Sequence, residues 1–215
     1  MLGIRERSAW VTRLGVLPNR RKAGVGQRLM AGLADAAAQR GLTFTVLEVI
    51  KHNEPGYNLF VRCGFRPVGE LLVLRRPPIA PLPPLAGRVE WLGRVDALER
   101  LETRTGRPPW TNHTQTFRNA QTVEGLAVTA ADGSQGWAVF QRQPLVLSHL
   151  VLHTEHGAAG TVGAALLAQI HHRYPDLDTH AENIALSDQH LAAFRQAHYV
   201  ESFRRIELYH DQAVV

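Results

Sequence analysis

A run of prolines in the middle of the chain is the strongest constraint on the fold. Residues 75–84 read Arg-Arg-Pro-Pro-Ile-Ala-Pro-Leu-Pro-Pro, with five prolines in ten residues. Proline lacks a backbone N–H and fixes φ, so this segment cannot form a helix or a central strand. A chain of 215 residues is long enough for two domains. We therefore predict a first domain over 1–76, an extended linker over 77–87 and a second domain over 88–215.

The same order of elements is expected on both sides of this linker. Apolar periodicity and turn residues predict strand, helix, strand, helix and strand in the first part, over 10–17, 24–40, 43–50, 57–62 and 65–74. The second part repeats the order over 145–152, 161–174, 177–181, 190–197 and 200–208. The second part also has additional elements before these, namely helices near 95–103 and 111–119 and a hairpin of 123–129 with 137–141. The fold class is therefore α/β, with two similar mixed units.

Aligning the two copies suggests that the first one is incomplete. Gly26 aligns with Gly163, 137 residues further on. At this offset the front part of the second copy, which begins near Arg88, has its counterpart before Met1. The first copy is predicted to lack roughly its first 50 residues, and an incomplete reading frame is one explanation.

Composition argues against several classes of protein. The net charge is +5, but the basic residues are scattered without interleaved aromatic residues, which does not favour nucleic-acid binding. Cys63 is the single cysteine, which excludes an intrachain disulfide. No signal peptide or long apolar stretch is found, so we expect a cytoplasmic protein without a membrane partner. The eleven histidines lack carboxylates or cysteines to complete a ligand set, and no metal is expected.

The turn before the first helix is the best candidate for a ligand site. It lies between a strand and a helix, and its glycines leave the backbone accessible. Helix starts have N–H groups without helical acceptors and a partial positive charge, so they bind anions. A tight connection without a ligand is the alternative interpretation. The candidate binding residues here are Val16, Arg21, Lys22, Ala23, Gly24, Val25, Gly26 and Gln27.

Two motifs in this region resemble one family. Arg21-x-x-Gly24-x-Gly26 resembles the Q/R-x-x-G-x-G/A signature of the acetyl-CoA-dependent N-acetyltransferases of the GNAT superfamily. Asn53-x6-Phe60-x3-Gly64-Phe65 has the spacing of a second GNAT motif. The resemblance implies a mixed sheet whose central strands part, with acetyl-CoA in the wedge and its diphosphate on the glycine turn. It also makes Asn53 and Phe60 candidate cofactor residues.

The second copy resembles the same family more faintly. Ala158 and Thr161 stand where the first copy has Arg21 and Gly24. We expect the second copy to keep the frame of the fold and to have lost cofactor binding.

Candidate catalytic groups are few. Phe60 stands where many GNAT proteins have a tyrosine that protonates the leaving thiolate, and Tyr57 is the nearby phenol that could replace it. Glu48 on the central strand is the candidate base. The alternatives are a packed aromatic for Tyr57 and an ion-paired group for Glu48.

These features favour an N-acetyltransferase that transfers the acetyl group of acetyl-CoA to a primary amine by direct attack, with a small-molecule amine as the acceptor by default. The alternative is a non-catalytic acyl-CoA-binding or structural protein. A first copy without its front elements would expose a sheet edge and a core face. We expect the second copy to cover them, or another chain, which would give a homodimer.

Overall fold

The computed structural model describes residues 1–80 and 83–211. Pro81 and Leu82 of the predicted linker and the last four residues of the predicted second domain lie outside the described residues. The chain divides into two compact units, which are described separately. Unit 1 comprises Met1–Leu71 and the segment from Phe203, and unit 2 comprises Leu72–Ser202.

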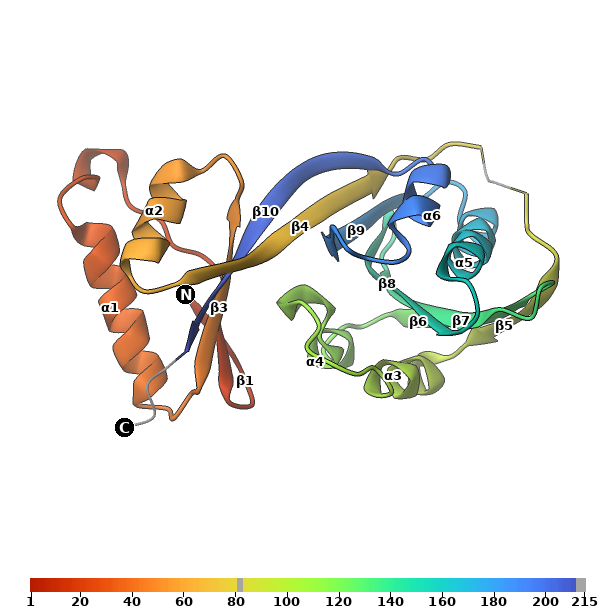
Figure 1. Ribbon diagram of the computed structural model, residues 1–215, viewed down its shortest axis with the longest axis horizontal. Coiled ribbons are helices and arrows are strands. Elements are labelled where there is room, and N and C mark those ends of the chain that lie inside the picture. The colour runs from red at the N-terminus through yellow and green to blue at the C-terminus, as the bar shows by residue number, and fades with distance from the viewer. Residues whose placement is uncertain (81–82, 212–215) are drawn as a thin grey trace. The chain divides into compact units, whose positions relative to one another are not determined.

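Unit 1 is a mixed sheet with helices packed on it (Figure 1). Its strand order is β1-β2-β3-β10-β4. The strands are β1 (Leu2–Arg5), β2 (Ser8–Val11), β3 (Phe44–Ile50), β4 (Arg66–Arg76) and β10 (Val200–Asp211). The helices are the 3-10 turn η1 (Pro18–Arg20), α1 (Val25–Ala38) and α2 (Glu54–Arg62). The last residues of β4 and the first residues of β10 belong to unit 2.

The core of unit 1 lies between the sheet and these helices. Alternate residues of β3, Leu47 and Val49, pack with Met30 of α1 and Phe60 of α2. A Cβ atom at Gly26 would lie 2.9 Å from the Leu59 side chain, so the glycine lets α1 approach α2 closely.

Unit 2 has a sheet covered by helices on both faces. Its strand order is β4-β9-β8-β7-β6-β5. The other strands are β5 (Gly87–Leu92), β6 (Val123–Ala130), β7 (Gln135–Arg142), β8 (Val146–His156) and β9 (Asp178–Ala185). One core cluster contains residues of α5 (Ala159–Arg173) and α6 (Leu191–Gln196). A second contains residues of α3 (Arg94–Glu102) and α4 (Thr114–Arg118), which follows the short turn η2 (Trp110–Asn112).

The predicted mixed α/β fold is confirmed, and so is the repeated order of elements. β2-α1-β3-α2-β4 in the first part corresponds to β8-α5-β9-α6-β10 in the second. The glycine correspondence also holds in space, because a Cβ atom at Gly163 in α5 would lie 2.8 Å from Ala193 in α6, as Gly26 approaches Leu59. The loss of front elements from the first copy stays a prediction.

Three details of the sequence interpretation were wrong. The strand expected over 10–17 is β2, which ends at Val11, because the following residues leave the sheet. Strands β1 and β5 were not expected, since both are short and rich in charged or small residues. The boundaries of the two units also differ from those of the two sequence copies. The reason is that the end of β10 pairs antiparallel with β3, from Arg205 opposite Ile50 to Asp211 opposite Phe44.

A buried histidine should make unit 2 sensitive to acid. His171 is fully buried, and its Nε2 lies 3.1 Å from the Tyr199 hydroxyl. Burial, assisted by the charge of Arg76, lowers the pKa of His171 from 6.5 to about 3. Below pH 6.5 the unfolded chain therefore binds a proton that the folded chain does not, and stability falls as the pH falls toward 3. Between pH 7 and 5 this histidine should cost about 2 kcal/mol of unfolding free energy.

The measurement is urea unfolding at pH 7 and pH 5. His171→Gln should flatten the pH dependence by that amount, whereas His172→Gln, at the exposed neighbouring position, should leave it unchanged. An equal slope in the wild type and His171→Gln would contradict the prediction.

Candidate anion-binding site at the start of α1

The site begins where two parallel strands part. β2 and β3 pair only from Ser8 with Phe44 to Trp10 with Val46. β3 continues to Ile50, while the chain after Val11 turns away toward α1. The predicted wedge between the central strands therefore corresponds to an observed divergence of this strand pair.

The turn that follows has the backbone geometry of an anion site. Lys22 and Gly24 both have left-handed backbone conformations, with φ of +61° and +73°. The Arg28 N–H donates to the carbonyl of Gly24, the residue at which the helix begins, and Gly24 makes no side-chain capping bond. Among the residues that the structure describes, no backbone acceptor is found for the N–H groups from Lys22 to Gln27. Such groups at a helix start are free to bind a ligand oxygen.

The charge around this turn is positive. Arg20, Arg21 and Lys22 are exposed, and the first turn of α1 contains no acidic residue. The Arg21 Nε donates to the Val16 carbonyl at 3.2 Å, which ties the side chain back to the incoming segment. Arg28 was not among the predicted residues, yet its Nη1 lies 3.6 Å from where a Gly24 Cβ would be. The spacing of four residues from Gly24 on a helix was the signal that could have found it.

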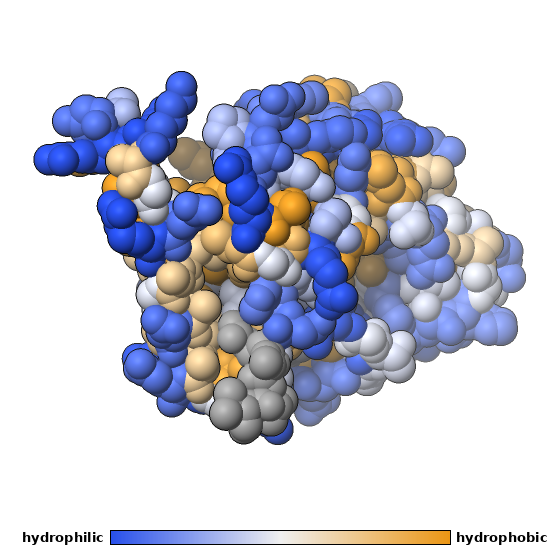
Figure 2. Space-filling model, turned by 60° about the vertical axis from the view of Figure 1, so that its left-hand side comes forward, coloured by the Kyte–Doolittle hydropathy of each residue, from blue (hydrophilic) through white to orange (hydrophobic). Residues whose placement is uncertain are grey.

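The predicted binding residues occupy different environments. Lys22, Ala23, Gly24 and Gln27 are exposed in the turn and first helical turn, and Val16 and Val25 are half-buried. Gly26 is half-buried against α2. In Figure 2, the side that carries α1 and α2 in Figure 1 comes forward, and hydrophobic patches lie between hydrophilic side chains. Exposed Leu17 and Leu29 are among the apolar residues near the turn.

Asn53 and Phe60 have evident structural roles. The Asn53 Oδ1 accepts from the Gly56 N–H at 3.2 Å and caps the start of α2. Phe60 is buried and meets the Phe65 ring edge-on at 6.2 Å. The second motif thus fixes α2 onto the sheet, and its contact with a ligand stays a prediction.

The two candidate catalytic residues are engaged with the protein. The Glu48 side chain is only 5% exposed, and its Oε2 lies 3.2 Å from Arg205 Nη1. Glu48 also lies opposite Glu207 in the β3–β10 pair. Tyr57 packs against the core cluster of unit 1. Their catalytic roles therefore stay predictions.

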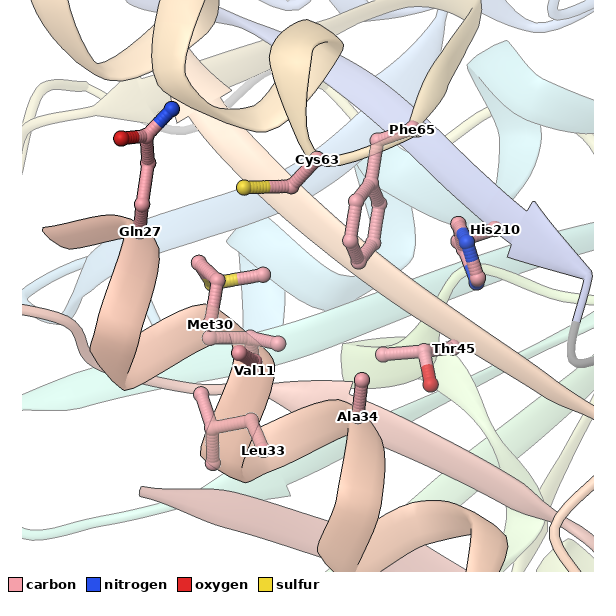
Figure 3. A pocket seen from close by; sticks show the side chains of 10 residues that line it. Val11, Gln27, Met30, Leu33, Ala34, Thr45, Cys63, Phe65 and His210 are labelled. Carbon is pink, nitrogen blue, oxygen red and sulfur yellow. The ribbon is translucent and has the colours of Figure 1, made fainter.

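An apolar pocket lies under α1, apart from the parting of β2 and β3. It has a volume of about 230 Å³, and Figure 3 shows Met30, Leu33 and Ala34 facing Cys63 and Phe65 across it. Thr45 lines it at a position still paired with Ala9, before the strands part. Burial raises the pKa of the Cys63 thiol, against the effect of Arg62, so a reactive thiolate is not favoured.

The described ranges contain neither a metal-ligand cluster nor a membrane-spanning helix. Within residues 1–80 and 83–211, no three His, Cys, Asp or Glu side chains come together as a metal site. None of the helices in these ranges combines the length and the apolar character needed to cross a membrane.

Comparison with known proteins agrees with this geometry. Residues 2–65 match the acetyltransferase (GNAT) family model. A search of curated proteins gives no match by sequence. The matched residues form the segment that carries the parted strands and the glycine turn, and this segment is similar in sequence to the GNAT acetyltransferases. The family model is one of acetyltransferases.

Solved structures share the fold over nearly the whole chain. A GCN5-related N-acetyltransferase from Sphaerobacter thermophilus is 18% identical, with a TM-score of 0.68, covering 97% of this chain and 75% of that one. A tandem GNAT protein from the clavulanic acid biosynthesis pathway is 17% identical, with a TM-score of 0.62 and coverages of 96% and 76%. A GCN5-related N-acetyltransferase from Kribbella flavida is 15% identical, with a TM-score of 0.59 and coverages of 94% and 80%. These likenesses establish the fold.

Substitutions at Asn53 should separate capping from ligand binding. Asn53→Ala removes the cap of α2 and should lower the free energy of unfolding by about 1 kcal/mol, whereas Asn53→Asp keeps a capping oxygen and should not. Urea denaturation of the three proteins measures both effects. If Asn53 also contacts the cofactor, Asn53→Asp will weaken acetyl-CoA binding while stability is kept. An Asn53→Ala protein as stable as the wild type would contradict the capping role.

Proposed function

We propose that unit 1 binds acetyl-CoA and that the chain transfers the acetyl group to a primary amine. The observation that carries the proposal is the turn from Lys22 to Gln27, whose N–H groups and surrounding cations adjoin the parting of β2 and β3. A diphosphate fits this turn because the backbone N–H groups, the start of α1 and the arginine and lysine side chains all favour negative charge. The pantetheine arm would then follow the edge of β3 where β2 has left it.

The proposed transfer is a direct attack. The neutral amine attacks the thioester carbonyl carbon, the C–S bond breaks, the amine loses a proton and the CoA thiolate gains one. Backbone N–H groups near the parted strands would stabilise the oxyanion, which is the largest contribution to such reactions. Glu48 as the base and Tyr57 as the acid are part of the proposal. A positioned acid or base contributes about 10² to 10⁴ in rate, so loss of one would slow the transfer without preventing it.

The acceptor and setting belong to the same proposal. A small-molecule amine is the acceptor proposed by default, and α1 and α2 are the α-helices among the described residues of unit 1. We keep a cytoplasmic location and a homodimer as parts of the proposal. The chain as a tandem of two GNAT copies is supported by the repeated element order and by the matched packing of Gly26 and Gly163.

A second function is favoured by one observation. Glu48 is buried and paired with Arg205, and Tyr57 is packed, so both candidate catalytic groups have other contacts. A protein that binds acyl-CoA without turnover would have this arrangement. Detection of free thiol with a broad panel of amines separates the two functions, since a binding protein releases none.

Reversing one charge in the turn should abolish most cofactor binding. Arg21→Glu places a carboxylate beside the proposed diphosphate site, and loss of charge-assisted hydrogen bonds should weaken acetyl-CoA binding by about ten- to a hundredfold. Calorimetric titration measures this. Arg40→Glu is the matched control, because Arg40 is also exposed and also donates one side-chain hydrogen bond to a backbone carbonyl, that of Ala36 at 3.0 Å. Equal weakening by both variants, or by neither, would contradict the proposed position of the diphosphate.

A further inference from the structure

The helix start of unit 2 that corresponds to the α1 turn is filled by the protein itself. Only Gly157 and Ala158 join β8 to α5, whereas thirteen residues join β2 to α1. The Ala158 N–H donates to the Ser134 hydroxyl at 3.0 Å. Asp132 accepts from the Ser134 N–H at 2.9 Å. Hydrogen bonds from Ser134, with a smaller one from Thr161, lower the pKa of Asp132. A carboxylate and a hydroxyl of the β6–β7 turn thus lie where a diphosphate would bind.

The strands of unit 2 nevertheless part as they do in unit 1. β8 and β9 pair only at Val146 with Asp178 and at Leu147 with Thr179. Beyond them is a pocket of about 220 Å³, lined by the continuing residues of both strands. This volume is below that of pockets for drug-sized ligands, about 300–1,000 Å³, and suits a small metabolite better than a coenzyme.

One wall of this pocket contains the Arg104 guanidinium, which is only partly hydrogen-bonded to the protein. Arg104 Nε donates to the Leu101 carbonyl at 3.1 Å, and its Nη2 donates to the Asn112 carbonyl at 2.9 Å. These bonds fix the guanidinium, while Nη1 has no hydrogen-bond acceptor among the described residues. Burial lowers the pKa of Arg104 to about 10, so the group remains charged at neutral pH but is poorly hydrated. A desolvated guanidinium with a free N–H edge favours a carboxylate.

A polar group of opposite sign and an apolar wall complete the pocket. Asp188 lines it with a side chain 30% exposed. The Asp188 Oδ1 accepts from the His190 N–H at 2.8 Å, which orients the carboxylate. Asn112 is 6% exposed and also lines the pocket, and its Oδ1 has no hydrogen-bond partner among the described atoms. The apolar part of the lining includes Leu150, Leu152, Ile184 and Phe194.

We infer that unit 2 binds a small α-amino carboxylate, such as a free amino acid, in this pocket between β8 and β9. Arg104 holds the carboxylate, Asp188 and the Asn112 amide oxygen receive the ammonium group, and the apolar wall receives the side chain. Because Asp132 and Ser134 fill the start of α5, this ligand binds without a CoA moiety in the same unit.

The test is calorimetric titration of the full chain with L-leucine and two analogues. L-leucinamide lacks the carboxylate, and 4-methylpentanoate lacks the amine. L-leucine should bind with a Kd of about 1 mM or tighter, and each analogue at least about tenfold more weakly. No heat from L-leucine up to about 10 mM, or equal binding of the amide, would overturn the inference.

Three variants locate the site. Asp188→Asn keeps an oxygen for the His190 N–H and should weaken L-leucine binding about tenfold, and Ala185→Leu places a larger side chain in the pocket lining and should abolish it. Arg195→Gln, at an exposed position of the same unit outside the pocket, is the control and should bind normally. If Ala185→Leu binds L-leucine as the wild type does, the amino acid binds outside this pocket and the inference is overturned. Acetyl-CoA titration of the same variants reports on unit 1 separately.

Discussion

The pairing of β3 with β10 is the interaction on which the site in unit 1 depends. β3 is paired with β10 along its whole length, from Phe44 to Ile50, but with β2 only along its first three residues. The antiparallel ladder therefore keeps β3 straight and ordered where β2 has left it. Where β2 has left it, β3 is hydrogen-bonded along its other edge. The last strand of the chain supplies that support.

Ion pairs near the ends of these strands reinforce the same arrangement. Glu70 on β4 accepts from Lys51, which follows β3, at 2.7 Å and from Arg204 on β10 at 3.4 Å. Arg66 and Asp211 form a further pair between β4 and β10. Exposed pairs contribute little stability individually, and these pairs link strands that are far apart in sequence. The first unit is consequently a product of both ends of the chain, and residues 1–76 alone do not contain its complete sheet.

Elements that depend on interactions between residues close in sequence were predicted, and those that depend on distant residues were not. The apolar run Phe44–Ile50 and the helical spacing of α1 and α5 are local signals, and these elements lie where they were predicted. Residues 12–17 contain the apolar Leu14, Val16 and Leu17 and were expected to continue the strand, but a strand needs a neighbour to pair with, and no local pattern reports one. The pairing of β10 with β3 likewise joins residues far apart in the sequence, so no local pattern predicts it. At the site, the motif glycines were predicted from the sequence. The packing of Gly26 against Leu59 and the position of Arg28 are visible only in the structure.

The two helix starts differ in the protein groups that surround them. Both α1 and α5 begin after a strand that parts from its neighbour, and both have the partial positive charge of a helix start. At α1 the nearby exposed side chains include Arg20, Arg21 and Lys22, and the first turn of the helix contains no acidic residue. At α5 a hairpin turn supplies Asp132 and Ser134. Because the turn between β6 and β7 contributes these groups, elements that precede β8 in the chain determine what the start of α5 contacts.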